Sequence, residues 1–408
     1  MTATPVRDTP ANLTAEDHRL GDGAIHVARA GILVGAAGLA VSLIWGRSAE
    51  DLGHRFFHAY LVSFAFYLSL SLGGLFFVIL QHLTRSGWSV VLRRPAESIA
   101  SNLWLMAILA LPLIPGIRHL YHWADADAVA RDHLLHGKEP YLNVQFFLIR
   151  LAVCFVVWIA LAAFFRRNSV RQDSTGDVGL TLRMQKWSAP AMLLYAVTAT
   201  FAAFDLLMSL DPHWYSTIFG VYYFSGSVLG FFAMLALTVL LLQRAGRLAH
   251  AVTAEHYHDL GKLVFAFTVF WAYIAFSQYM LIWYANIPEE TVWYLRRQNG
   301  EWAVVGLALL FGHFVVPFLV LMSRWQKRRP GVLAACCVWV LLMHLLDMYW
   351  LVIPQTSPTS ARPSLVDITC FLGVGGLYVA GLALSLRRQA LVPLRDPRLR
   401  ESLAFENV

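Results

Sequence analysis

The stretch KLVFAFTVFWAYIAFSQYMLIWYANIP, residues 262–288, has no charged side chain after Lys262. About 20 mostly apolar residues suffice to cross the hydrocarbon core of a bilayer as a helix. Runs of this kind recur along the chain and predict an all-α polytopic membrane protein with ten transmembrane helices. The expected spans are 27–45, 57–80, 99–117, 142–165, 188–210, 218–243, 261–286, 301–323, 331–351 and 365–386.

The composition excludes several other classes of protein. Hydrophobic residues make up 58% of the 408 residues and charged residues only 14%, whereas a soluble domain carries about 25% charged residues. Four cysteines are too few for a secreted disulfide scaffold, and the apolar content is too high for a disordered chain. Only a membrane protein fits these numbers.

The basic residues predict the orientation in the membrane. If the N-terminus is cytoplasmic, 23 of the 32 Lys and Arg residues fall in cytoplasmic segments and 8 in outer loops. This bias follows the positive-inside rule and places both termini in the cytoplasm. It also explains the net charge of +7 without nucleic-acid binding. The expected organisation is a tail at 1–26, a membrane domain at 27–386 and a second tail at 387–408.

A repeated feature suggests internal symmetry. Asp205 lies seven residues before Pro212, and Asp347 lies seven residues before Pro354. Both helices run in the same direction, so both carboxylates are expected in the outer half of the membrane. This favours two four-helix bundles, 57–210 and 218–351, in parallel repeat with one flanking helix at each end. Coincidence between two helix ends is the alternative.

Ionisable side chains inside spans are costly, so each one needs an explanation. His344 and Asp347 are three residues apart and therefore share one helix face. A carboxylate beside an imidazole can exchange protons near neutral pH. Together with Asp205 and Arg150, this pair predicts a proton-handling site or a quinone head-group pocket in the outer leaflet. The alternative is a structural ion pair between Arg150 and an aspartate, with His344 as an ordinary core residue.

Further candidates lie in the spans and in one expected inner loop. His313, Gln278 and Tyr273 are polar groups at membrane depth, where they can line a path for protons. The loop before the seventh span is expected to supply a proton entrance, unless it is simply a polar loop. The entrance candidates are Glu255, His256, His258, Asp259 and Lys262.

Motifs for bound redox groups, metals and nucleotides are missing from the sequence. All four cysteines fall in expected spans without CxxC spacing, which argues against an iron–sulfur ligand set or a zinc site in this chain. No phosphate-binding glycine loop is present. The sequence therefore predicts no covalently bound cofactor and no metal, and any electron transfer would pass through partner subunits.

Three stretches carry a resemblance to a known family: 125–150, 203–226 (AFDLLMSLDPHWYSTIFGVYYFSG) and 258–291 (HDLGKLVFAFTVFWAYIAFSQYMLIWYANIPEET). They resemble the second large membrane subunit of alternative complex III, an ActF-type relative of the NrfD/PsrC-like quinol-handling proteins. The resemblance extends over most of the chain from about 25 to 386. It implies a bacterial plasma membrane protein within a quinol:cytochrome c oxidoreductase.

The resemblance also implies partners and a substrate. The expected partners are a homologous ten-helix membrane subunit, haem c subunits, an iron–sulfur subunit and a terminal oxidase, with lipids around them. The expected substrate is menaquinone or ubiquinone. The chain would contribute to quinol handling, proton translocation or both. The alternatives are an assembly scaffold of that complex and a stand-alone secondary transporter.

Overall fold

The computed structural model describes residues 19–47 and 52–407, and within them the chain is all-α. Ten helical segments in this part are long and apolar enough to cross a membrane, as predicted. The spans are built from α1 (Gly23–Arg47), α2 (Leu52–Leu83), α3 (Val90–Ser101) with α4 (Leu103–Ala110), α8 (Val144–Thr175), α9 (Val178–Leu206), α10 (Phe219–Arg244), α11 (Ala254–Ala285), α13 (Glu301–Ala308) with α14 (Val316–Met322), α16 (Pro330–Val352) and α17 (Leu365–Arg387).

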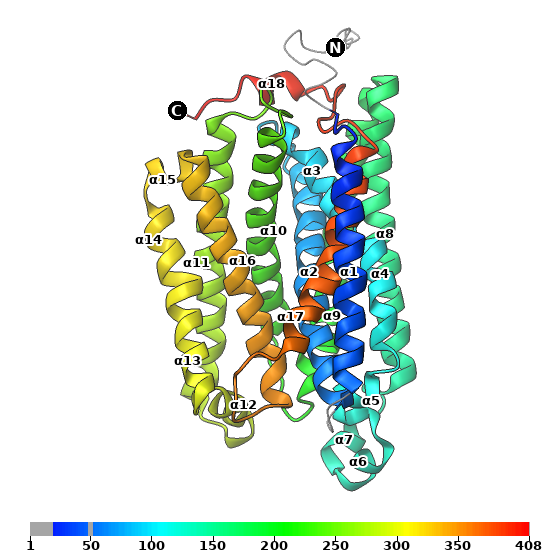
Figure 1. Cartoon of the computed structure of the whole chain (residues 1–408), viewed down its shortest axis with the longest axis vertical. Helices are drawn as coiled ribbons and strands as arrows, with labels where there is room; N and C mark the ends of the chain where they lie inside the picture. The colour runs from blue at the N-terminus through cyan, green and yellow to red at the C-terminus, as the bar shows by residue number, and fades with distance from the viewer. Residues whose placement is uncertain (1–18, 48–51, 408) are drawn as a thin grey trace.

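Short elements connect the spans at both ends of the bundle. They are η1 (Leu111–Leu113), α5 (Ile117–Leu120), η2 (His122–Ala124), α6 (Ala126–Arg131), α7 (His133–Lys138), η3 (Met208–Leu210), α12 (Pro288–Gln298), α15 (Arg324–Arg328), η5 (Ile353–Gln355) and α18 (Leu399–Leu403). A π-helical segment, η4 (Leu309–Val315), joins α13 to α14. We call the end that carries α18 the terminal face and the end that carries α5–α7 and α12 the loop face (Figure 1).

Helices α2 and α10 form the centre of the bundle. Helix α2 packs against α3, α8 and α9, α10 packs against α11 and α16, and the two central helices pack against each other. Gly73 permits this close approach, because a Cβ there would lie 2.4 Å from the Ser227 carbonyl oxygen. The helices that carry Asp205 and Asp347, α9 and α16, both pack on α2 and α10.

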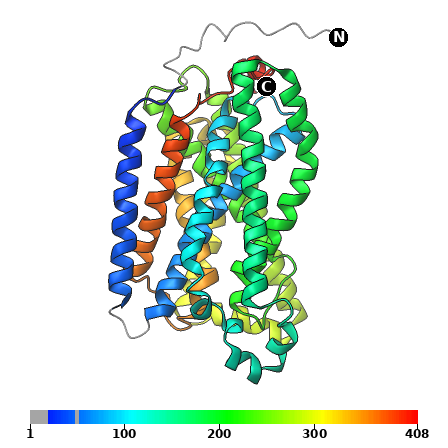
Figure 2. The same ribbon diagram turned by 90° about the vertical axis from the view of Figure 1, so that its right-hand side faces the viewer.

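Helices α1 and α17 pair along their length and flank the bundle, as both views show (Figures 1 and 2). Glycines line their contact: a Cβ on Gly376 would lie 2.6 Å from the Gly35 nitrogen and 2.5 Å from the Gly31 oxygen. Small residues at such spacing let helices in lipid approach closely, and close packing is what drives their association there. Helix α17 in turn packs on α2, so the pair is attached to the core.

Several helices extend beyond the predicted spans. The third span runs over Val90–Leu113 instead of 99–117, and α9 begins ten residues before the expected position. The expected start of the third span is wrong because the charged residues Arg93, Arg94 and Glu97 looked solvent-exposed in the sequence. In the structure they are buried in α3. Carboxylates from distant segments compensate the arginines: Asp396 lies 3.0 Å from Arg93 and Asp173 lies 3.0 Å from Arg94.

The C-terminal segment is not the free tail that 387–408 suggested. Leu391 and Val392 are fully buried, and the Ser402 hydroxyl donates to the Trp88 carbonyl oxygen at 2.5 Å. The segment therefore closes the terminal face over α3 (Figure 1). Of the expected N-terminal tail at 1–26, residues 1–18 lie outside the described part, and α1 begins at Gly23.

Asp396 is expected to anchor this segment. Asp396→Asn removes the only ion-pair partner that the described residues give to the buried Arg93 guanidinium. Breaking a buried pair on one side costs about 3–5 kcal/mol, so the thermal unfolding temperature of the purified protein should fall. The exposed carboxylate Glu406 offers the matched control, Glu406→Gln. Equal unfolding temperatures for the two variants would contradict the anchoring role.

Candidate functional site

Asp347 is the centre of a buried polar cluster in the second bundle. Its carboxylate is fully buried on α16. The Tyr222 hydroxyl of α10 donates to Oδ1, and Trp271 Nε1 of α11 donates to Oδ2 at 3.2 Å. No described Lys, Arg or His lies within ion-pair distance of this carboxylate. A buried carboxylate held by neutral donors alone is poised to exchange a proton, because no fixed positive charge holds it ionised.

Two imidazoles lie beside this carboxylate. The His313 ring, on the π-helical segment η4, lies 4.0 Å from the Trp271 ring and 6.3 Å from the His344 ring, measured between centroids. Both His313 nitrogens and Nδ1 of His344 are buried without a hydrogen-bond partner among the described residues. Buried polar atoms are nearly always paired in proteins, so unpaired ones call for an explanation. The π-helical turn that carries His313 is also a feature found often at functional sites.

The tautomer of neutral His344 follows from its one hydrogen bond. The Ser69 hydroxyl donates to the Phe66 carbonyl oxygen at 2.6 Å, and Ser69 Oγ lies 2.8 Å from His344 Nε2. Because a serine has a single hydroxyl proton, its oxygen must accept here and Nε2 must donate. The unpaired Nδ1 therefore carries a free lone pair. We refer to Tyr222, Trp271, His313, His344 and Asp347 as the His–Asp cluster.

A cavity of about 590 Å³ opens beside the His–Asp cluster between α10, α11, α12, α13, η4 and α16. Tyr222 and Trp271 form its inner wall, so they separate it from Asp347. Its wall is mostly apolar, and Phe276 and Leu307 are more than half exposed at its edge. A concave apolar site with a few polar groups is the usual form of a small-molecule pocket.

Arg297 is the main polar group in the wall of this cavity. Its side chain is buried, and its guanidinium carbon lies 3.5 Å from the Trp293 ring centroid. Three of its five N–H groups donate to backbone oxygens of Trp350, Trp293 and Leu351, at 3.1, 3.0 and 2.9 Å. Burial lowers the pKa of Arg297, yet an arginine stays charged near neutral pH. The other two N–H groups have no hydrogen-bond partner among the described residues.

Gln278 lies next to this wall and connects it to a loop. Gln278 Nε2 donates to the Tyr294 hydroxyl oxygen at 3.1 Å, and the Ser216 hydroxyl donates to Gln278 Oε1 at 3.0 Å. Burial raises the pKa of Tyr294, so its hydroxyl remains protonated. Gln278 thus orients a tyrosine of the cavity wall.

Asp205 has a different environment from its counterpart Asp347. Arg150 donates from Nε to Oδ2 at 2.8 Å and from Nη2 to Oδ1 at 2.9 Å, and the Tyr141 hydroxyl donates to Oδ1 at 3.1 Å. The Arg150 guanidinium also stacks on the Tyr141 ring at 3.9 Å. A bidentate arginine–carboxylate pair is a strong contact of fixed geometry, so Asp205 is a structural ion-pair partner.

The single outer cluster expected from the sequence is therefore wrong. The structure brings His313, His344 and Asp347 together but places Arg150 and Asp205 in a separate ion pair on α8 and α9. Tyr273 lies apart from both, because it is 64% exposed on the side of α11 that faces away from the bundle. The position of a residue along its predicted span gives its depth in the membrane. It does not show whether the side chain faces lipid or the inside of the bundle.

The expected proton-entrance residues lie in the first turns of α11, not in a loop. Glu255 pairs with Arg328, Asp259 pairs with Lys262, and His256 caps the helix through Thr253. His258 is buried beside them. Among the described residues, no hydrogen-bonded chain joins this group to the His–Asp cluster.

The sequence reasoning missed Tyr222, Ser69 and Arg297. Tyr222 and Ser69 lie in uncharged helical runs that look like ordinary core, and Arg297 lies in what looked like a solvated loop. The one available signal was the WYLRR stretch at 293–297, where aromatic rings precede two arginines. Within residues 19–47 and 52–407, no group of three or more His, Cys, Asp or Glu side chains is placed to hold a metal ion.

No protein-family model matches this chain, and no curated protein matches its sequence. The His–Asp cluster and the adjoining cavity are therefore the basis for the function assigned below.

Proposed function

We propose that this chain is a quinol-handling membrane subunit of a bacterial respiratory quinol:electron-acceptor oxidoreductase of the alternative complex III type. The observation that carries the proposal is the buried carboxylate of Asp347. It has no cationic partner in the part of the chain that the structure describes, and one side chain separates it from the apolar cavity. This arrangement combines a proton acceptor with a site for an apolar substrate.

The cavity suits both parts of an isoprenoid quinol. The two spare N–H groups of Arg297 can donate to one ring oxygen, and the Tyr222 hydroxyl lies on the inner wall to meet the other. The apolar edge at Phe276 and Leu307 leads out towards lipid, which gives the isoprenoid tail an exit. The binding energy would come mainly from burial of apolar surface.

Proton transfer would pass through Tyr222. When a quinol hydroxyl donates its proton to the Tyr222 oxygen, Tyr222 passes its own proton to Asp347 Oδ1, to which it is already hydrogen-bonded. A quinol releases two protons and two electrons on oxidation to quinone. The unpaired Nδ1 of His344, on the same helix as Asp347, and the His313 ring, which packs on Trp271, are the candidate acceptors for the second proton. The two electrons would go to haem c and iron–sulfur partner subunits.

The distribution of charge is compatible with this assembly. The α8–α9 and α10–α11 connections, the segment around α15 and the C-terminal segment lie at the terminal face (Figure 1). Seventeen arginines and lysines fall in the corresponding stretches 166–186, 244–262, 324–329 and 387–400. By the positive-inside rule that face would be cytoplasmic. The His–Asp cluster and its cavity would then lie in the outer half of the membrane, near partners on the outer surface.

Filling the cavity tests the substrate assignment. Ala275 lines the cavity on α11, so Ala275→Trp should weaken binding of short-chain analogues of ubiquinone and menaquinone by at least tenfold, measured by equilibrium binding to the purified protein. Leu193→Trp is the matched control, because Leu193 is 71% exposed on α9 and lies outside the cavity. Failure of the unaltered protein to bind either analogue would contradict the proposal.

Isolation under mild conditions separates the remaining alternatives. A respiratory subunit should co-purify in mild detergent with subunits that contain haem c. A stand-alone transporter should purify without them. An assembly scaffold should co-purify with them, yet show no effect of Ala275→Trp on quinol turnover per complex.

A further inference from the structure

A second apolar recess lies on the other side of α16, between α2, α16 and α17, and has a volume of about 260 Å³. We call it the α2–α16–α17 groove. Val62, Leu345 and Phe371 line it, together with Leu342 and Ile368, which are each 52% exposed. Since Asp347 bonds to α10 and α11 instead, this groove is separate from the His–Asp cluster.

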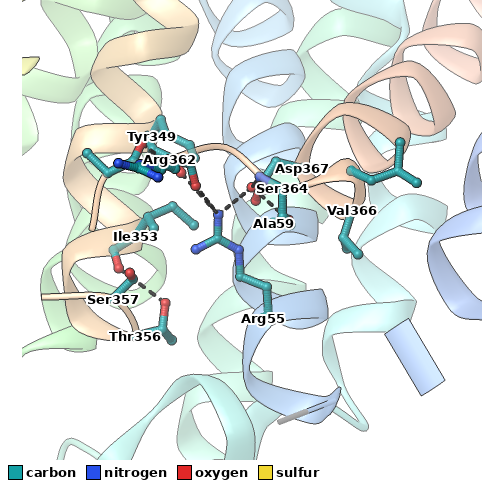
Figure 3. Close-up of polar contacts among 12 residues, drawn as sticks. Arg55, Ala59, Tyr349, Ile353, Thr356, Ser357, Arg362, Ser364, Val366 and Asp367 are labelled. Carbon is teal, nitrogen blue, oxygen red and sulfur yellow. Dashed lines mark hydrogen bonds and ion pairs between the residues drawn. The ribbon is translucent and has the colours of Figure 1, made fainter. Parts of the chain in front are cut away.

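The groove has a polar mouth at the loop face. Arg55 donates from Nη2 to Asp367 and, at 3.0 Å, to the Tyr349 hydroxyl, and Asp367 and Tyr349 both line the groove. Figure 3 shows one terminal nitrogen of the Arg55 guanidinium turned towards these partners and the other turned away from them. That second nitrogen, Nη1, has no hydrogen-bond partner among the described residues. Arg362, whose side chain is 84% exposed, lies at the same mouth.

The depth of these groups matches the layers of a bilayer. Arg55 opens the second span and Asp367 lies in the first turn of α17, so both are at head-group level. Leu342 lies seven residues before Tyr349 on α16, which places it about 10 Å deeper along the helix. The groove therefore runs from a polar mouth of paired arginines into the acyl-chain region and has an open, lipid-facing side.

We propose that the α2–α16–α17 groove binds one glycerophospholipid, with its phosphate on Arg55 Nη1 and an acyl chain against Leu342, Ile368 and Phe371. Guanidinium groups are favoured phosphate donors. Arg362, whose Nε lies 3.2 Å from the Glu301 carboxylate, brings a second guanidinium to the mouth. Asp367 does not displace the phosphate, because it occupies the opposite nitrogen of the guanidinium. The lipid connects α17, and with it α1, to the core helices α2 and α16.

Photo-crosslinking of the purified chain tests the proposal. p-Benzoylphenylalanine is placed at Ile368 in the groove or at Leu33, a lipid-facing control on α1 that is 71% exposed. The protein is washed extensively in detergent and then irradiated, and its intact mass is measured. We expect an adduct with the mass of a phospholipid at Ile368 and none at Leu33, because only a bound lipid survives the wash.

Two variants identify the contacts. With the probe at Ile368, Arg55→Gln should reduce the phospholipid adduct at least fivefold by weakening the phosphate contact. Leu342→Trp should reduce it at least as much by filling the groove, and it leaves the Arg55–Asp367 pair intact. The proposal is overturned if Ile368 and Leu33 give equal adducts, if the adduct at Ile368 is a protein chain, or if neither variant changes its yield.

Discussion

Asp347→Asn is expected to lower quinol turnover of the assembled complex by about 10²-fold, the low end of what a positioned acid–base group contributes. Asparagine keeps the shape: its single oxygen can accept from Trp271, and its amide N–H can donate to the Tyr222 hydroxyl oxygen. It cannot, however, take up the proton that Tyr222 passes on. Because the geometry is kept, assembly should change little. The measurement is quinol-dependent reduction of the electron acceptor per complex, normalised to haem content.

Two further variants decide how this result is interpreted. Tyr222→Phe removes the relay hydroxyl and should lower turnover in the same direction. Glu289→Gln removes an exposed carboxylate of α12 and should leave turnover within twofold of the unaltered complex. If Asp347→Asn reduces the amount of complex recovered but not the turnover of each complex, the cluster is structural and the scaffold alternative is correct.

Arg150→Met is expected to destabilise the protein by about 3–5 kcal/mol, because it leaves the buried Asp205 carboxylate without a cation. The double variant Arg150→Met/Asp205→Asn should recover most of this loss, since it removes both charges together. Denaturation of the purified protein in detergent, followed by helical circular dichroism, measures both effects.

This comparison separates an ion pair from a proton site. The difference in free energy of unfolding between Asp347→Asn and the unaltered protein should be far smaller than the difference between Arg150→Met and the double variant. The reason is that Asp347 has no cationic partner among the described residues that its replacement would leave unpaired. A double variant no more stable than Arg150→Met would mean that Arg150 stabilises the fold by stacking on Tyr141 and Phe146, with little contribution from its charge.

Asp205 and Asp347, which hold corresponding positions in the sequence, show how much of the site the sequence predicts. Their equal spacing to a proline is visible in the sequence, and in the structure both lie in the C-terminal part of their helices, α9 and α16. Their roles differ, however, because Arg150 on α8 reaches only one of them and Tyr222 on α10 reaches only the other. Which neighbour a buried carboxylate meets depends on helix rotation and packing.

Hydropathy determined the number of membrane-spanning helices and the all-α fold. The free energy of placing a residue in lipid depends mainly on that residue, and these free energies sum along a helix. The helix ends were less predictable at Arg93 and Arg94, because the carboxylates that pair with them lie about 300 and about 80 positions away in the sequence, respectively. The cavity, the role of Arg297 and the separation of Tyr273 from the cluster arose only in the tertiary structure. These features depend on which faces of distant helices meet, and no local property of the chain encodes that.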